Sequence, residues 1–187
     1  MPVLVSLLRA VNLGGRNRIK MVALRDVYRD LQLRDAQTYV QSGNVVFRTN
    51  TRDLLKLAGR IESAIAESFG FQSSVILRTT AELREVIARN PFANRRDVKP
   101  DRLAVVFLAG DPGHKAREQI REMKIEPEEL RIADRELYIY FPNGMGRSKL
   151  SVPRLEKALG TSGTARNWNS VLKLLEMAET LEAGVEC

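Results

Sequence analysis

The amino-acid sequence predicts an α+β protein of two ferredoxin-like halves, each a split βαβ unit with an antiparallel or mixed sheet, plus a C-terminal helix. Residues 1–78 show elements in the order β-α-β-β-α-β, and residues 103–166 repeat that order. Between them, residues 90–102 contain two prolines and lack apolar periodicity. We therefore predict a first half over residues 1–89, a linker over 90–102 and a second half over 103–187.

The first half begins with residues 3–8, an apolar run typical of a buried strand. A helix follows from Met21 to Leu31, because its apolar residues are spaced three and four apart. Short strands over 36–40 and 45–48 predict a hairpin around the turn sequence Ser42-Gly43-Asn44. The remaining elements are a helix capped by Thr51 and ended by Gly70, a strand over 71–78, and a helix opened by the capping-box pair Thr79 and Glu82.

The second half starts with an apolar strand over residues 103–108. Asp111-Pro112 is a capping residue followed by a proline, and it predicts a helix that runs to about Met123. The later elements are a hairpin of strands 130–133 and 137–141, a helix over 151–159, a short strand at 164–166 and a last helix over 169–182. The apolar residues expected on one side of that last helix are Val171, Leu172, Leu175, Ala178 and Leu181.

A loop over residues 8–21, LRAVNLGGRNRIKM, connects the first predicted strand to the first predicted helix. Its glycines and asparagines tolerate positive φ, and it carries four cations, Arg9, Arg16, Arg18 and Lys20. Such a strand-to-helix loop favours an anion, because backbone N–H groups and the helix N-terminus point at it. The loop is neither a P-loop nor a dinucleotide fingerprint, since the glycines that those motifs require are missing.

Two further stretches combine polar turn residues with cations. Residues 142–149, PNGMGRSK, lie between a predicted strand and a predicted helix. Residues 164–169, TARNWN, hold the only tryptophan. We interpret Trp168 as a core residue at the start of the last helix, with a neighbouring asparagine as the N-cap. For Arg166, both a structural role and pairing with a phosphate or carboxylate stay open.

The charge of the chain is unevenly distributed. The formal net charge is +7, and residues 1–100 carry 17 basic against 9 acidic residues, whereas residues 101–187 carry 13 against 14. This asymmetry favours an anionic partner for the first half. The alternative is a solvated arginine-rich surface, because several of these arginines lie on predicted helix faces opposite the apolar stripe.

Composition excludes several kinds of chemistry. His114 is the only histidine and is predicted to face solvent, and Cys187 is the only cysteine. Nucleophile–histidine catalysis, a disulfide framework and a zinc site are therefore not expected. We predict no metal site, although a carboxylate-held Mg²⁺ without a recognisable motif stays open, and any cofactor is unknown. Because we find neither a signal peptide nor a long apolar stretch, we expect a cytoplasmic protein without a membrane partner.

Five motifs occur in order along the chain: residues 8–15 (LRAVNLGG) with Lys20-Met21, residues 39–47 (YVQSGNVVF), Asn90-Pro91-Phe92, residues 143–150 (NGMGRSKL) and residues 165–169 (ARNWN). Together they resemble a bacterial family known only as domain of unknown function 1697. The resemblance extends over nearly the whole chain. One departure is Ala10, where the family pattern usually has glycine. The resemblance implies a cytoplasmic α+β protein of this size and supplies no activity, substrate or catalytic residue.

We predict that the protein binds a small phosphate- or carboxylate-bearing ligand in a polar pocket formed by these loops, because ligands gather at junctions between elements. The sequence leaves open whether the protein is an enzyme; if it is, Lys20 or Lys149 is the expected electrostatic catalyst. The predicted ligand-binding residues are Arg9, Asn12, Gly14, Gly15, Lys20, Ser42, Asn44, Arg147, Lys149, Arg166 and Asn167.

Two other functions stay open at the level of sequence. One is RNA binding by the basic first half, and the other is a non-enzymatic assembly module; the oligomeric state is not predicted. An RNA surface would use basic side chains for the phosphates and aromatic side chains for stacking on bases. The residues concerned are Arg16, Arg18, Arg95 and Arg96, with Tyr138 and Tyr140 as a pair that either stacks on bases or packs within a sheet.

Overall fold

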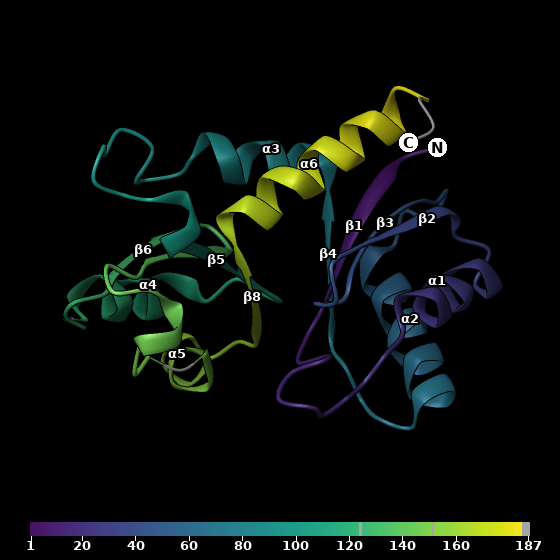
Figure 1. The fold of residues 1–187 in the computed structure, drawn as a ribbon, viewed down its shortest axis with the longest axis horizontal. Coiled ribbons are helices and arrows are strands. Elements are labelled where there is room, and N and C mark those ends of the chain that lie inside the picture. The colour runs from purple at the N-terminus through teal and green to yellow at the C-terminus, as the bar shows by residue number, and fades with distance from the viewer. Residues whose placement is uncertain (124, 151, 185–187) are drawn as a thin grey trace. The chain divides into compact units, whose positions relative to one another are not determined.

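The computed structural model describes residues 1–123, 125–150 and 152–184 (Figure 1). The order β-α-β-β-α-β occurs twice, first followed by α3 and then by α6. The strands are β1 (Val3–Leu8), β2 (Arg34–Tyr39), β3 (Asn44–Arg48), β4 (Val75–Thr79), β5 (Leu103–Leu108), β6 (Glu129–Ala133), β7 (Glu136–Tyr140) and β8 (Gly163–Asn167). The helices are α1 (Met21–Asp30), α2 (Leu54–Phe69), α3 (Thr80–Ala88), α4 (Gly113–Glu122), α5 (Val152–Leu159) and α6 (Trp168–Glu182), with 3-10 turns η1 (Pro100–Arg102) and η2 (Met145–Arg147).

The chain divides into two compact units, of which unit 1 comprises Met1–Arg84 together with Lys173–Cys187. Its sheet has the strand order β2-β3-β1-β4, and every neighbouring pair is antiparallel. The central strand β1 places Val5 opposite Val46 of β3 and Arg78 of β4. Figure 1 shows α1 and α2 on the same face of this sheet.

The core of unit 1 lies between that sheet face and the two helices. Leu24 and Tyr28 of α1 and Ile61 of α2 are fully buried, because residues four apart share one helix face. The ring of Tyr28 meets Phe47 edge-on at a centroid distance of 5.2 Å, and its hydroxyl donates to Ser6 Oγ at 2.6 Å. Each fully buried leucine or isoleucine contributes about 1.5–3 kcal/mol of stabilisation.

Unit 2 comprises Glu85–Leu172 and repeats this design. Its sheet has the order β6-β7-β5-β8, again antiparallel throughout, with Val105 of β5 opposite Tyr138 of β7 and Arg166 of β8. Alternate residues of β5 join a core that includes Ile120 of α4 and Leu155 of α5. The two antiparallel sheets with their helices confirm the predicted α+β fold class.

Helix α6 begins in unit 2, but its residues from Lys173 on belong to unit 1. Within unit 1, Arg84 Nε donates to Glu179 Oε1 at 2.7 Å, and Arg84 Nη2 donates to Glu182 Oε2 at 3.0 Å. The guanidinium of Arg48 also donates to the carbonyl oxygen of Leu181. The compact units therefore divide the chain at other positions than the predicted halves, and the segment predicted as a linker, residues 90–102, is counted within unit 2.

Several predicted element ends need correction. Asp53, not Thr51, caps α2, because the Asp53 side chain accepts from Lys56 N at 3.0 Å. Strand β4 begins at Val75, four residues later than predicted, since Phe71 packs against Phe69 and the helix core instead of extending the strand.

The second capping prediction in unit 1 is confirmed. Thr79 N donates to Glu82 Oε2 at 2.7 Å, and Glu82 N donates to Thr79 Oγ1 at 3.1 Å, which is a reciprocal capping box. In unit 2, Pro112 lies one residue before α4, and Asp111 Oδ1 accepts from Gly113 N at 2.7 Å. Within the described residues, none of the helices combines the length and the apolar character that crossing a membrane requires.

Candidate functional site

Three connections of unit 1 are joined by hydrogen bonds at one end of its sheet. The β1–α1 loop is held to the β2–β3 turn, because Leu8 N donates to Gly43 O at 2.9 Å and Asn12 Nδ2 donates to Gln41 O at 2.7 Å. The same loop is held to the segment before β4 by Arg9 N, which donates to Ser74 O at 2.9 Å. Three segments that are far apart in sequence thus form one polar corner.

Asn12 closes the β1–α1 loop on itself. Its side-chain Nδ2 donates to Ile19 O at 3.1 Å, and its Oδ1 accepts from Ile19 N at 2.9 Å. Asn17 supports the other side of the loop, since its Nδ2 donates to Ala10 O at 3.0 Å. Together these bonds give a fixed loop whose ends lie close together, so α1 begins at a defined position.

Positive φ angles recur throughout this loop. Asn12 has φ 53°, Gly14 has φ 55° and Gly15 has φ 77°, as the sequence predicts from these residue types. Ala10 also adopts a positive φ, 55°, although its Cβ disfavours that conformation. The one departure from the family pattern is therefore at a position where glycine has a physical advantage.

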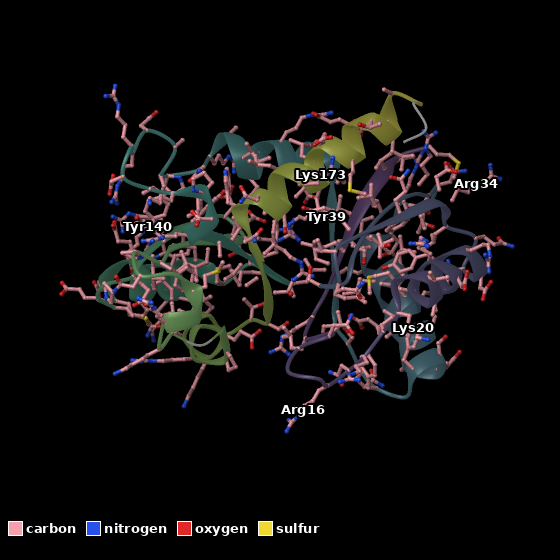
Figure 2. The ribbon with its side chains drawn as sticks, in the orientation of Figure 1. Arg16, Lys20, Arg34, Tyr39, Tyr140 and Lys173 are labelled. Carbon is pink, nitrogen blue, oxygen red and sulfur yellow. The ribbon has the colours of Figure 1, made fainter. Side chains whose placement is uncertain are left out.

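A groove of about 710 Å³ lies beside this loop at the start of α1. We call it the loop groove, and its lining residues are Asn12, Gly15, Arg18, Ile19, Lys20, Met21, Val22 and Gln41. Lys20 is the N-cap residue of α1, and Figure 2 shows its side chain at the start of the helix. Arg16, by contrast, extends away from the tip of the loop (Figure 2).

The electrostatics of the loop groove favour an anion. Within the described residues no side chain caps α1, and its first turn contains no acidic residue. Because the first N–H groups of any helix have no intrahelical acceptor, those of α1 are available to a ligand. Arg18 and Lys20 are exposed, and neither has a hydrogen-bond or ion-pair partner within the described part of the chain. The groove thus combines unsatisfied N–H groups with two cations.

The other predicted residues of unit 1 lie next to this groove without lining it. Asn44 is fully buried, and its Nδ2 donates to Tyr39 O at 3.1 Å and to Ser42 Oγ at 2.8 Å. Arg9 is half-buried at the end of β1, and Gly14 lies at the exposed tip of the loop. In the structure Asn44 and Ser42 hold the turn that contacts the loop.

Unit 2 places Arg147 and Lys149 in a groove of its own, with a volume of about 740 Å³. We call it the unit 2 groove, and Glu126, Glu128 and Arg154 also line it. Arg147 and Lys149 are exposed at the connection between β7 and α5. Two carboxylates and three cations therefore face one groove in this unit.

Residues 164–169, the third stretch predicted to contact a ligand, have structural roles. Arg166 is 6% exposed, and its Nη1 donates to Thr164 Oγ1 and Ala165 O, both at 2.8 Å. Burial lowers the pKa of Arg166 to about 10, so the guanidinium stays charged at neutral pH. Asn167 Oδ1 accepts from Ser170 N at 2.8 Å and caps α6. Trp168 is buried, as the structural interpretation of this residue predicts.

Three of the four residues considered for RNA contact in unit 2, Arg95, Tyr138 and Tyr140, are engaged by other parts of the protein, whereas Arg96 is exposed. Tyr138 and Tyr140 are 1% and 6% exposed, and their hydroxyls donate to Val86 O at 2.7 Å and Asp97 O at 3.0 Å. Arg95 lies over the ring of Tyr140 and forms ion pairs with Asp97 and Glu129, which raise the pKa of its guanidinium. This pair of tyrosines is therefore packed within the protein and does not present an open stacking surface.

His114 has a side chain that is 82% exposed, as predicted, and its Nδ1 lies 3.5 Å from Glu118 Oε2. Cys187 lies outside the described residues. Arg18 and Gln41 line the loop groove but were not among the predicted ligand-binding residues. For Arg18 a signal was available, since it is a cation two residues before the helix N-cap. For Gln41 there was none, because its proximity arises from the pairing of separate loops.

The protein is an α+β protein of two βαββαβ units, and the loop groove lies at the polar corner of unit 1. The family model described as a protein of unknown function (DUF1697) matches residues 1–138, and the chain belongs to this family. The motifs at 143–150 and 165–169 lie beyond the matched residues. Among curated proteins, none matches the chain.

Among solved structures, the chain is similar to one described as a conserved bacterial protein from Streptococcus pneumoniae. The TM-score is 0.76 at 20% sequence identity, and the superposition covers 96% of this chain and 99% of the other. At that identity the likeness extends to the fold, and it covers both units.

Proposed function

We propose that unit 1 binds a small anionic ligand, bearing a phosphate or a carboxylate, in the loop groove. One observation carries the proposal: the uncapped N-terminus of α1, Arg18 and Lys20 all border a groove of about 710 Å³. Backbone N–H groups at a helix N-terminus and flexible cations are a recurrent way to hold a phosphate or carboxylate. Among the residues that the structure describes, neither cation has a side-chain partner that binding would displace.

The remaining lining residues suggest the character of the rest of the ligand. Gly15 lacks a side chain, which permits a ligand to approach the backbone closely. Met21 and Val22 also line the groove, and Val22 is 60% exposed. An anionic head with an apolar body therefore fits this groove better than an ion that is polar on every side.

The other residues predicted from the sequence have different roles in this proposal. Gly15 and Lys20 would contact the ligand, whereas Asn12, Ser42 and Asn44 would act by holding the loops that form the groove. Arg147 and Lys149 remain predicted anion contacts of unit 2. If the protein catalyses a reaction in unit 1, Lys20 is the residue placed to stabilise developing negative charge.

The test compares two double variants that remove the same charge. Arg18→Ala with Lys20→Ala alters the loop groove, and Arg52→Ala with Lys56→Ala removes one arginine and one lysine elsewhere on unit 1. Thermal shift and calorimetry would be run with inorganic phosphate and with short-chain and longer-chain carboxylates and phosphate monoesters. We expect the groove variant to bind at least about tenfold more weakly, because charge-assisted hydrogen bonds contribute about 1.5–3 kcal/mol.

Equal binding by wild type and the groove variant would reject the site, and so would equal losses in both double variants. A short single-stranded RNA in the same panel addresses the RNA alternative. That alternative has less support, because Arg95 is ion-paired and both tyrosines are buried. RNA binding that exceeds all small anions and falls steeply with salt would favour it over our proposal.

A further inference from the structure

Unit 1 contains a second and larger groove, with a volume of about 1080 Å³. It lies between the later turns of α1, the α1–β2 connection, the β3–α2 connection and α2. Four arginines line it, Arg25, Arg29, Arg34 and Arg60, and we call it the arginine groove. In Figure 2, Arg34 lies at the opposite end of unit 1 from Arg16 of the β1–α1 loop.

The acidic residues in this groove are already neutralised by neighbouring arginines. Asp26 Oδ1 lies 2.9 Å from Arg29 Nη2, and Asp35 Oδ2 lies 3.3 Å from Arg48 Nε. Arg25 donates to the hydroxyl of Thr38 at 2.9 Å, which leaves its positive charge uncompensated. The groove therefore has an excess of positive charge.

Arg34 and Arg60 are the arginines of this groove that are most available to a ligand. Both are exposed, and within the described part of the chain neither has a hydrogen bond or an ion pair through its side chain. Two unengaged guanidinium groups beside Arg25 present planar, bidentate donors at several positions along one groove. Such an array matches a ligand with several linked anionic groups better than a single anion.

The equivalent place in unit 2 provides an internal comparison. The unit 2 groove is also formed by the connection between the first helix and second strand and by that between the third strand and second helix. There, Glu126 and Glu128 have no ion-pair partner within the described residues, and they offset two of the three cations that line the groove, Arg147, Lys149 and Arg154. In the arginine groove both aspartates are held by arginines, which leaves the charges of Arg25, Arg34 and Arg60 uncompensated. This larger excess of positive charge favours unit 1 as the site of a polyanion.

Two features narrow the class of ligand. No aromatic side chain is among the described residues that line the arginine groove, so no ring is available for stacking on a base. The neighbouring edge strand β2 has a register shift between Arg34 and Gln37, and Asp35 has φ 55°, so its edge is irregular where a peptide strand would pair. We propose that the arginine groove binds an oligophosphate chain, recognised through its phosphates alone.

The experiment titrates wild type with inorganic tripolyphosphate by calorimetry at low and at physiological salt. The groove variant is Arg34→Ala with Arg60→Ala. The matched control is Arg16→Ala with Arg52→Ala, two exposed arginines of unit 1 that line neither groove. Melting temperatures of both variants establish that they are folded, and all four substituted positions are exposed, so the core is untouched.

We expect wild type and the control to bind with the same Kd, and the groove variant to bind at least about tenfold more weakly. Orthophosphate should bind far more weakly than tripolyphosphate, and ATP no more tightly than tripolyphosphate. No binding by wild type, or equal losses in both double variants, would overturn the proposal. Tighter binding of ATP or of a short RNA would overturn the assignment to phosphates alone.

Discussion

Gly43 is the residue at which the backbone requirements of unit 1 are most severe. It has φ 72°, and a Cβ there would meet Val11 Cγ2 at 2.6 Å and Leu8 Cβ at 2.7 Å. We expect Gly43→Ala to destabilise the protein by about 2–5 kcal/mol, combining ~1–2 kcal/mol for the left-handed backbone with ~1–3 kcal/mol for overpacking. Chemical denaturation measures this loss.

Gly14→Ala is the matched control for that prediction. Gly14 has φ 55°, but a Cβ there would meet nothing within 4 Å. Its substitution should cost about 1–2 kcal/mol, the backbone contribution alone. If the two variants are equally stable, the close contact of the β2–β3 turn with Leu8 and Val11 is not a determinant of stability.

At the scale of residues, sequence identified the polar corner but not the task of each side chain in it. Glycine and asparagine predicted positive φ correctly, whereas Val40 has φ 50° with no sequence signal, and at Ala10, with φ 55°, the only signal was the glycine of the family pattern. Asn12 and Asn44 were predicted ligand contacts, yet their carboxamides bond to backbone and to Ser42. A carboxamide suits a ligand and a loop equally well, so its role depends on three-dimensional neighbours.

At the scale of elements, α6 shows a face that sequence predicted only in part. Val171, Ala178 and Leu181 are buried as expected, but Leu172 is 40% exposed and Leu174 is fully buried. Residues 171, 174, 178 and 181 are spaced three and four apart, which is the period of one helix face. The predicted set held Leu172 and Leu175 in place of Leu174, because residues three apart also share a helix face.

A pair of leucine substitutions tests this face. Leu174→Ala should destabilise the protein by about 2–5 kcal/mol, because it leaves a cavity in a buried site. Leu172→Ala should change stability by less than about 0.5 kcal/mol, because its side chain already contacts water. Thermal or chemical unfolding of both variants measures the difference, and the reverse order of stabilities would contradict the assigned face.

Element order and type were predictable throughout, because hydrophobic period and turn residues are local properties. Boundaries were less predictable where two signals compete. Thr51 and Asp53 are both good caps, and only the position of the first helical N–H groups decides for Asp53. Phe71 has a strong strand propensity, but its ring packs beside Phe69 after the helix ends at Gly70.

At the scale of the whole molecule, the membership of each segment in a unit was the least predictable feature. The order of elements predicts two similar halves, and it places the last helix in the second half, residues 103–187. The side chains that hold its C-terminal part, Arg48 and Arg84, are long-range partners from unit 1. Arginines outside the core are common, so nothing in the local sequence around Arg48 and Arg84 indicates such a partner.

Acid stability is a property of the whole molecule to which single carboxylates contribute. The hydrogen bonds from Arg95 hold the pKa of Asp97 below its usual range, with Arg95 Nε 3.1 Å from Asp97 Oδ1. A carboxyl whose pKa is lower in the folded than in the unfolded state adds stability above about pH 4, and that stability is lost as the pH falls further. Asp97 should therefore steepen the decline of the melting temperature in acid.

Asp97→Asn removes this titration. We expect the variant to melt at a lower temperature than wild type at neutral pH, and the two curves of melting temperature against pH to converge below about pH 4. Asp30→Asn is the control, because Asp30 is exposed and has no ion pair within the described residues. Its curve should run parallel to that of wild type. A constant difference between Asp97→Asn and wild type at every pH would mean that Asp97 stabilises the protein through contacts that do not depend on its charge.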